Sequence, residues 1–270
     1  MGAPIARFVR RTWSGGLVSL LGAALVVAAA VVPGYSVADL RLHDGTVFAI
    51  KQDKALLGTV NTSIKDLATA TRLPDGNVDV LQEERTVIIR SRSSNQVQSY
   101  DPASGRLGPV VSLPPAGDLA LNAGKVAIIS RSNGAVWFGE TSQMLGRDFN
   151  QEKALLDLGE NALVTVTTEG QLIGLSLTTS ELVRLSGSSP VRTKVPLQLD
   201  AQVADVELSA VGDQAVVLDR TKQSIWFEGL STPIEMPLGS KARLASPIPQ
   251  SPLMGGQLRA LVGTPRGLVG

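Results

Sequence analysis

The fold of this chain is decided by residues 118–138, which read DLALNAGKVAIISRSNGAVWF. The stretch opens with an aspartate and a leucine, continues with the apolar run Val126–Ile129, and reverses at Asn133-Gly134 into a second run, Ala135–Phe138. Asn-Gly between two apolar runs is the strongest short signal of a β-hairpin, because both residues accept a positive φ at little cost. The stretch therefore predicts short antiparallel strands.

An aspartate followed by leucine or valine recurs along the chain at a nearly constant spacing. The successive spacings are about 40, 39, 39 and 48 residues, and a repeat of roughly 40 residues made of short strands is typical of propeller blades. The pairs are Asp39-Leu40, Asp79-Val80, Asp118-Leu119, Asp157-Leu158 and Asp205-Val206. We predict an all-β fold, a β-propeller-like array of about five to six four-stranded blades within residues 33–270. The longer last spacing predicts an insertion near Ser186–Pro190.

Two features refine this prediction. The fully apolar runs Val87–Ile89 and Val126–Ile129 suit strands that are covered on both faces, and we assign them to the inner strands of their blades. A sixth unit, from Leu258–Val262, lacks its aspartate, and the chain stops within it at Gly270. Either the array stays open with an exposed edge strand, or the chain is a fragment of a longer protein, which we favour because open edges promote aggregation.

The N-terminal region predicts export or anchoring. Residues 13–32 carry no charge, Arg7, Arg10 and Arg11 precede them, and Pro33-Gly34 follows. Twenty such residues are about enough for a helix across a ~30 Å hydrocarbon layer. The arginines place residues 1–12 in the cytoplasm and residues 33–270 outside, as a single-pass protein of the cell membrane. The alternative is a signal peptide that is cleaved after the small residues near Ala28–Ala30.

Composition excludes several classes of function. The chain has no cysteine, which rules out disulfides and thiolate chemistry, and its only histidine is His43. With one histidine and no cysteine, a zinc site would have to be built mostly from carboxylates, which argues against one. No serine has the G-x-S-x-G context of a catalytic nucleophile. The net charge is +1, and the chain lacks a basic patch for nucleic acid. Only 4% of the residues are aromatic, so rings on which bases or sugars could stack are scarce. We predict no catalytic residue, no cofactor and no metal site.

The repeated aspartates and two tryptophans are the candidate special residues. One carboxylate per unit does not supply the six to eight oxygens that Ca²⁺ takes, so we interpret the aspartates as structural acceptors that define the repeat. These are Asp39, Asp79, Asp118, Asp157 and Asp205. Trp137 and Trp226 occupy the same place in two units, where they either pack in the interior or stack against a ligand such as a sugar ring.

The order of features resembles a known family. After the apolar span come Asp39–Ile50, Leu56–Asn61, Asp79–Gln82 and Tyr100-Asp101-Pro102. This arrangement, best over residues 13–140, resembles the N-terminal region of large membrane-anchored surface proteins of actinobacteria. In that family a propeller-like region is followed by fibronectin type III or other Ig-like repeats, which are not present here. The resemblance implies a role in cell-surface interaction and supplies no catalytic residue.

Taken together, the sequence favours a membrane-anchored, extracellular, non-catalytic scaffold or interaction module at the bacterial cell surface. Its expected partners are the cytoplasmic membrane and either cell-wall polysaccharide or other surface proteins. The alternative is a carbohydrate-binding or polysaccharide-degrading protein of the cell wall. A sensor that signals across the membrane is less consistent with a cytoplasmic tail of only 12 residues.

Overall fold

The structure is a computed structural model, and it describes residues 46–61, 66–186, 189–200, 205–235, 242–244, 262–264 and 267–269. The predicted segments 1–12 and 13–32 lie outside these residues. Among the residues that the structure describes, no helix has the length and apolar character that crossing a membrane requires. All described strands belong to the unit Gly45–Gly270.

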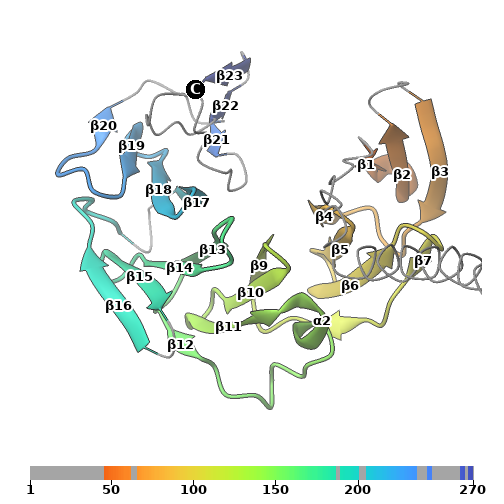
Figure 1. Cartoon of the computed structure of the whole chain (residues 1–270), viewed down its shortest axis with the longest axis horizontal. Helices are drawn as coiled ribbons and strands as arrows, with labels where there is room; N and C mark the ends of the chain where they lie inside the picture. The colour runs from red at the N-terminus through yellow and green to blue at the C-terminus, as the bar shows by residue number, and fades with distance from the viewer. Residues whose placement is uncertain are drawn as a thin grey trace, which may run out of the picture. The chain divides into compact units, whose positions relative to one another are not determined.

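The described chain folds into successive antiparallel sheets, as predicted (Figure 1). The first sheet holds β1 (Thr46–Lys51), β2 (Leu56–Asn61) and β3 (Asp66–Arg72), with the 3₁₀ turn η1 (Gln52–Lys54) between β1 and β2. The second holds β4 (Val78–Glu83), β5 (Thr86–Ser91), β6 (Gln96–Asp101) and β7 (Arg106–Leu107), and β8 (Val111–Ser112) also pairs with β6. The third holds β9 (Gly117–Asn122), β10 (Lys125–Ser130), β11 (Ala135–Glu140) and β12 (Leu156–Asp157), with the short helix α2 (Thr141–Met144) after β11.

The later sheets repeat the pattern. The fourth sheet holds β13 (Leu163–Val166), β14 (Leu172–Ser176), β15 (Glu181–Ser186) and β16 (Ser189–Lys194). The fifth holds β17 (Val206–Val211), β18 (Gln214–Asp219), β19 (Ser224–Phe227) and β20 (Ile234–Glu235). The sixth holds β21 (Arg243–Leu244), β22 (Val262–Thr264) and β23 (Gly267–Val269). Strands pair in chain order within each sheet, except that β8 pairs with β6.

The first strands of the sheets lie side by side. Strand β4 contacts β9, β9 contacts β13, β13 contacts β17, and β17 contacts β21. Each sheet therefore stacks its first strand against the first strands of its neighbours, which is the arrangement of propeller blades. The predicted propeller-like fold is confirmed.

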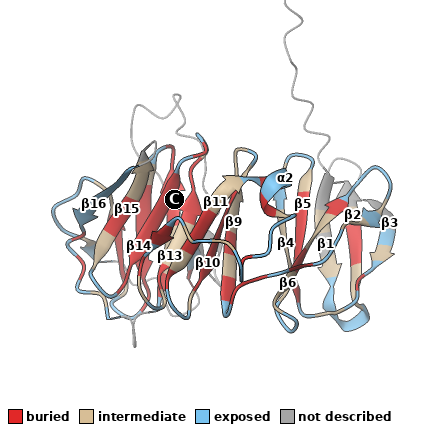
Figure 2. Ribbon diagram, turned by 90° about the horizontal axis from the view of Figure 1, so that it is seen from below, coloured by how far each residue is buried: buried red, intermediate tan, exposed pale blue. Residues whose placement is uncertain are grey.

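The hydrophobic core is divided into clusters, each of which draws on two consecutive sheets. Strand β10 shows why its sequence is apolar throughout. Val126 and Ile128 pack in the cluster with the second sheet, whereas Ala127 and Ile129 pack in the cluster with the fourth. Successive side chains of a strand point to opposite faces, so a strand between two sheets needs apolar residues at every position. Figure 2 shows the buried residues concentrated in such strands.

These apolar strands correct one prediction. Runs 87–89 and 126–129 belong to β5 and β10, which are the second strands of their sheets and not the inner ones. The first strands β4 and β9 contain the aspartate pairs themselves and are less buried than β5 and β10.

The expected insertion near residues 186–190 is also corrected. That region is the hairpin between β15 and β16, with Leu185 facing Pro190 and Ser186 facing Ser189. The spacing is longer because Asp157 lies on β12, the last strand of the third sheet, whereas Asp205 directly precedes β17, the first strand of the fifth.

Candidate functional site

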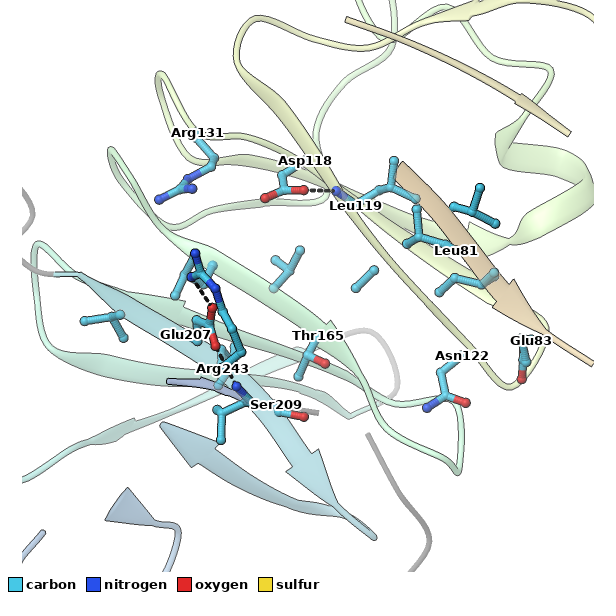
Figure 3. A pocket seen from close by; sticks show the side chains of 18 of the residues that line it. Leu81, Glu83, Asp118, Leu119, Asn122, Arg131, Thr165, Glu207, Ser209 and Arg243 are labelled. Atoms are coloured by element: carbon cyan, nitrogen blue, oxygen red, sulfur yellow. Dashed lines mark hydrogen bonds and ion pairs between the residues drawn. The ribbon is translucent and has the colours of Figure 1, made fainter. Parts of the chain in front are cut away.

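The first strands line a pocket of about 780 Å³ (Figure 3). Residues of β4, β9, β13, β17 and β21 form its wall, together with Arg92, Arg131 and Arg220. Each of these three arginines is the residue directly after the second strand of its sheet, β5, β10 or β18. The pocket thus combines side chains from five sheets at the place where their inner strands converge, and it is the candidate functional site.

Polar side chains lie at the two ends of the strands that line the pocket. On β9, Asp118 lies near the start of the strand and Asn122 at its end. Figure 3 shows Arg131 beside Asp118, and Glu83 near Asn122. Leucine and valine side chains of the first strands fill the stretch between these polar groups.

The fifth and sixth sheets contribute a charged network. Arg220 is 9% exposed, and it donates to Asp205 through Nε at 2.9 Å and to Glu207 through Nη1 at 2.9 Å. Glu207 also accepts from Arg243 Nη1 at 2.6 Å and from the Leu244 backbone N–H at 2.7 Å. Two carboxylates and two guanidinium groups therefore compensate one another.

The pKa values in this network follow from burial and hydrogen bonding. Burial raises the pKa of Glu207, although the Leu244 N–H and the charge of Arg220 act in the opposite direction. The hydrogen bond to Asp205 raises the pKa of Arg220, so that this guanidinium remains charged.

The second and third sheets contribute another set of ion pairs. Asp79 forms an ion pair with Arg92, with Oδ2 2.6 Å from Arg92 Nε, and it lies 3.9 Å from Arg90 Nη1. Asp118 accepts from Arg90 Nη1 at 2.6 Å and from the Leu119 N–H at 2.9 Å. The second and third sheets are therefore joined by an arginine that reaches from β5 to β9.

The predicted repeat aspartates occupy different places. Asp118 and Asp205 line the pocket, and Asp79 reaches it through Arg92. Asp157 does not have the equivalent position, because it lies on β12, the fourth strand of its sheet, where it accepts from the Gly159 N–H at 3.0 Å. Asp39 lies outside the described residues, as does His43. Each of the three aspartates near the pocket pairs with an arginine side chain.

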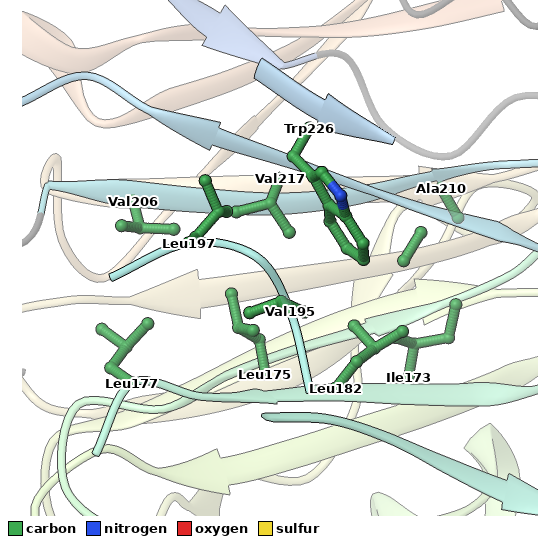
Figure 4. Packing of buried hydrophobic residues seen from close by; sticks show 11 residues of the cluster. Ile173, Leu175, Leu177, Leu182, Val195, Leu197, Val206, Ala210, Val217 and Trp226 are labelled. Carbon is green, nitrogen blue, oxygen red and sulfur yellow. The ribbon is translucent and has the colours of Figure 1, made fainter. Parts of the chain in front are cut away.

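The two tryptophans are packed in the interior. Trp226 is 3% exposed, lies between the fourth and fifth sheets, and donates from Nε1 to the Leu230 carbonyl at 2.9 Å (Figure 4). Trp137 is 7% exposed, donates to the Glu152 carbonyl at 3.1 Å, and meets Phe149 edge-to-face with ring centroids 5.6 Å apart. Neither ring offers a free face to a sugar, so the stacking interpretation is replaced by packing.

The arginines were missed at the sequence level, although a signal for them exists. Arg90, Arg131 and Arg220 follow the apolar cores of three second strands within two residues. Of these, Arg90 pairs with Asp118 and Arg220 with Asp205, whereas Arg131 makes no ion pair with any residue that the structure describes. As regards metals, the described ranges contain no group of three histidine, aspartate or glutamate side chains that suits an ion.

No known family model and no curated protein sequence matches the chain. Among solved structures, it is similar to a catalytically inactive virginiamycin B lyase from Staphylococcus aureus crystallised with quinupristin. The identity is 11% over 84% of this chain and 76% of that one, with a TM-score of 0.58.

Two further structures are similar. One is KlAtg21 in complex with the coiled coil of AgAtg16, with 13% identity over 84% of this chain and 81% of that one and a TM-score of 0.57. The other is the dihydro-heme d1 dehydrogenase NirN, with 12% identity over 75% of this chain, 47% of that chain and a TM-score of 0.51. The TM-scores show a shared propeller-like fold, whereas sequence identities this low show no shared activity.

Proposed function

We propose that this chain is a non-catalytic interaction module, a propeller-like domain held at the outer face of a bacterial cell membrane by residues 13–32. The observation that carries the proposal is the pocket at the convergence of the first strands. Its position offers a binding site that is built by five sheets and therefore held in place by the whole fold.

The state of the acidic groups supports binding over catalysis. A general acid or base needs a carboxyl group that can exchange its proton with a substrate. Asp118, Asp205 and Glu207 each accept from an arginine, and Glu83 accepts from the Gly124 N–H at 2.8 Å. Carboxylates that accept such hydrogen bonds hold the neighbouring side chains and backbone in place.

Membrane placement is tested with the full chain, which has no cysteine of its own. A cysteine is introduced at Val110, which is 53% exposed, and in a second variant at Gly2. In intact cells of a Gram-positive host, a membrane-impermeant maleimide is expected to label Val110→Cys, and Gly2→Cys only after lysis. Labelling of Val110→Cys only after lysis contradicts the proposal.

Anchoring and catalysis need separate measurements. Mass spectrometry of the detergent-extracted protein is expected to show residues 1–32 retained, and a mature chain that starts near Val31 supports the cleaved signal instead. Full-length protein is then incubated with cell-wall polysaccharide. Binding without any release of reducing sugar agrees with an interaction module, whereas sustained release establishes the polysaccharide-degrading alternative.

A further inference from the structure

We propose that the pocket binds a small polar molecule through an oxyanion group, a carboxylate or a phosphate, which Arg131 holds. This inference rests on the proposed function only in taking the pocket as the binding site. It does not depend on where in the cell the protein resides.

The backbone of Arg131 is fixed at the wall of the pocket. Its N–H donates to the Ala116 carbonyl at 3.3 Å, and its carbonyl accepts from the Asn161 N–H at 2.8 Å. These partners lie just before β9 and just before β13, so Arg131 is held between the third and fourth sheets. Its side chain lies among those that line the pocket (Figure 3).

The other charged groups of the pocket already have partners. Arg92 pairs with Asp79, Arg243 with Glu207, and Arg220 with both Asp205 and Glu207. By contrast, Arg131 makes no ion pair with any described residue, and its buried Nε makes no hydrogen bond there. A guanidinium that is partly withdrawn from water and makes no ion pair is costly, and a bound anion removes that cost.

The chemistry of the guanidinium selects the ligand. Its planar fork binds carboxylate and phosphate through two parallel hydrogen bonds, which gives both strength and orientation. The pocket volume of about 780 Å³ falls within the range of small-molecule sites. Beyond Arg131, the polar side chains of Asn122 and Glu83 lie elsewhere along the wall, where they suit the polar body of such a molecule.

The test is isothermal titration calorimetry on the full chain in detergent with four probes. Inorganic phosphate, glucose 6-phosphate and glucuronate carry the oxyanion, and glucose is the matched neutral molecule. The variants are Arg131→Gln, which removes the charge, and Arg131→Lys, which keeps the charge and loses the fork. Arg106→Gln is the control, because Arg106 is exposed on the outer strand β7 and changes the net charge equally.

We expect at least one oxyanion probe to bind ten times more tightly than glucose, which corresponds to about 1.4 kcal/mol. Arg131→Gln is expected to abolish that difference, Arg131→Lys to reduce it, and Arg106→Gln to leave it unchanged. The tighter of glucuronate and glucose 6-phosphate identifies the oxyanion as carboxylate or phosphate.

Three results overturn the inference: oxyanion probes that bind no better than glucose, wild-type affinity in Arg131→Gln, or an equal loss in Arg106→Gln. If Arg131→Gln does not fold, undiminished affinity in Arg131→Lys overturns the role of the fork. None of these results bears on the labelling of Val110→Cys in intact cells, so the two proposals fail separately.

Discussion

Arg90 and Asp118 join two consecutive sheets, because Nη1 of Arg90 donates to Oδ1 of Asp118 at 2.6 Å. The same guanidinium donates from Nη2 to the Gly117 carbonyl, also at 2.6 Å. Similar arginine contacts link later sheets: Arg184 of β15 pairs with Glu228, which follows β19, and Arg220 reaches the Ala242 carbonyl before β21 at 3.2 Å. Apolar clusters and arginine bridges therefore hold the sheets together jointly.

Removing this bridge is expected to destabilise the fold. The Arg90 side chain is 14% exposed and Asp118 is 36% exposed, so the contact is partly shielded from water. Arg90→Ala removes the two hydrogen bonds that the guanidinium donates to Asp118 and to the Gly117 carbonyl, and we expect a loss of about 1.5–3 kcal/mol in the free energy of unfolding. Urea unfolding followed by circular dichroism measures this loss.

Arg147→Ala is the matched control. Arg147 pairs with Glu152 at 2.6 Å, but both side chains are about 40% exposed. Exposed pairs contribute at most about 1 kcal/mol. A loss in Arg90→Ala no larger than that in Arg147→Ala means that the bridge between the sheets contributes nothing beyond a surface ion pair.

Gly134 packs against the linker to the next sheet, so an added methyl group has no room. A Cβ at Gly134 would lie 2.2 Å from the Gly159 nitrogen, and the residue has a φ of +79°. Gly124 has a φ of +70° with open space around it. We expect Gly124→Ala to cost about 1–2 kcal/mol from backbone strain alone. Gly134→Ala should cost clearly more, and equal urea midpoints for the two variants are incompatible with the close approach.

Trp226 is expected to act through packing. Trp226→Phe removes the hydrogen bond to the Leu230 carbonyl and part of the ring that fills the cluster between the fourth and fifth sheets. We expect a loss of about 1–3 kcal/mol in the free energy of unfolding. Unchanged stability together with lost binding in a glycan array would restore the ligand-stacking interpretation.

The turn Asp101–Gly105 predicts a pH dependence. The Ser104 hydroxyl and the Ala103 N–H donate to the Asp101 carboxylate, and these bonds lower its pKa. Since the folded pKa lies below the unfolded value of about 3.9, the stabilisation is present above that value and is lost as pH falls through the folded pKa.

Asp101→Asn tests this directly through urea unfolding at a series of pH values between 2 and 6, as an approximate range. Wild type is expected to be the more stable above pH ~4, and the difference should shrink towards the acidic end. A difference that stays constant over the whole series excludes the ionised carboxylate as its source.

The sequence was sufficient for the fold because its signals are local. Asn133-Gly134 and the apolar strands such as β10 follow from turn geometry and from the alternation of side chains. The repeat spacing then indicated the number of sheets. The same reasoning correctly expected strands such as β10 to be covered on both faces. It assigned them to the inner position of the blade, whereas they are the second strands of their sheets.

The candidate site was not predictable in the same way, because it depends on contacts between distant residues. Arg90 meets Asp118 across 28 positions, and Arg243 meets Glu207 across 36. The aspartate motif also misled at Asp157, where the same dipeptide lies on a fourth strand. Only the stacking of the sheets brings the arginines to one pocket.

The most direct test of this account is a disulfide between two consecutive sheets. A Cβ at Gly170, in the turn after β13, would lie 3.3 Å from the Ala123 Cβ, in the turn after β9. Disulfides join Cβ atoms about 3.5–4.5 Å apart, and the chain has no cysteine of its own.

The double variant Ala123→Cys with Gly170→Cys is oxidised under native conditions, and Ala123→Cys with Gly229→Cys is the control pair. Mass spectrometry of proteolytic peptides should find the 123–170 cross-link in high yield and none in the control. Two free thiols in the folded double variant after oxidation would contradict the stacking of the third and fourth sheets and, with it, the pocket.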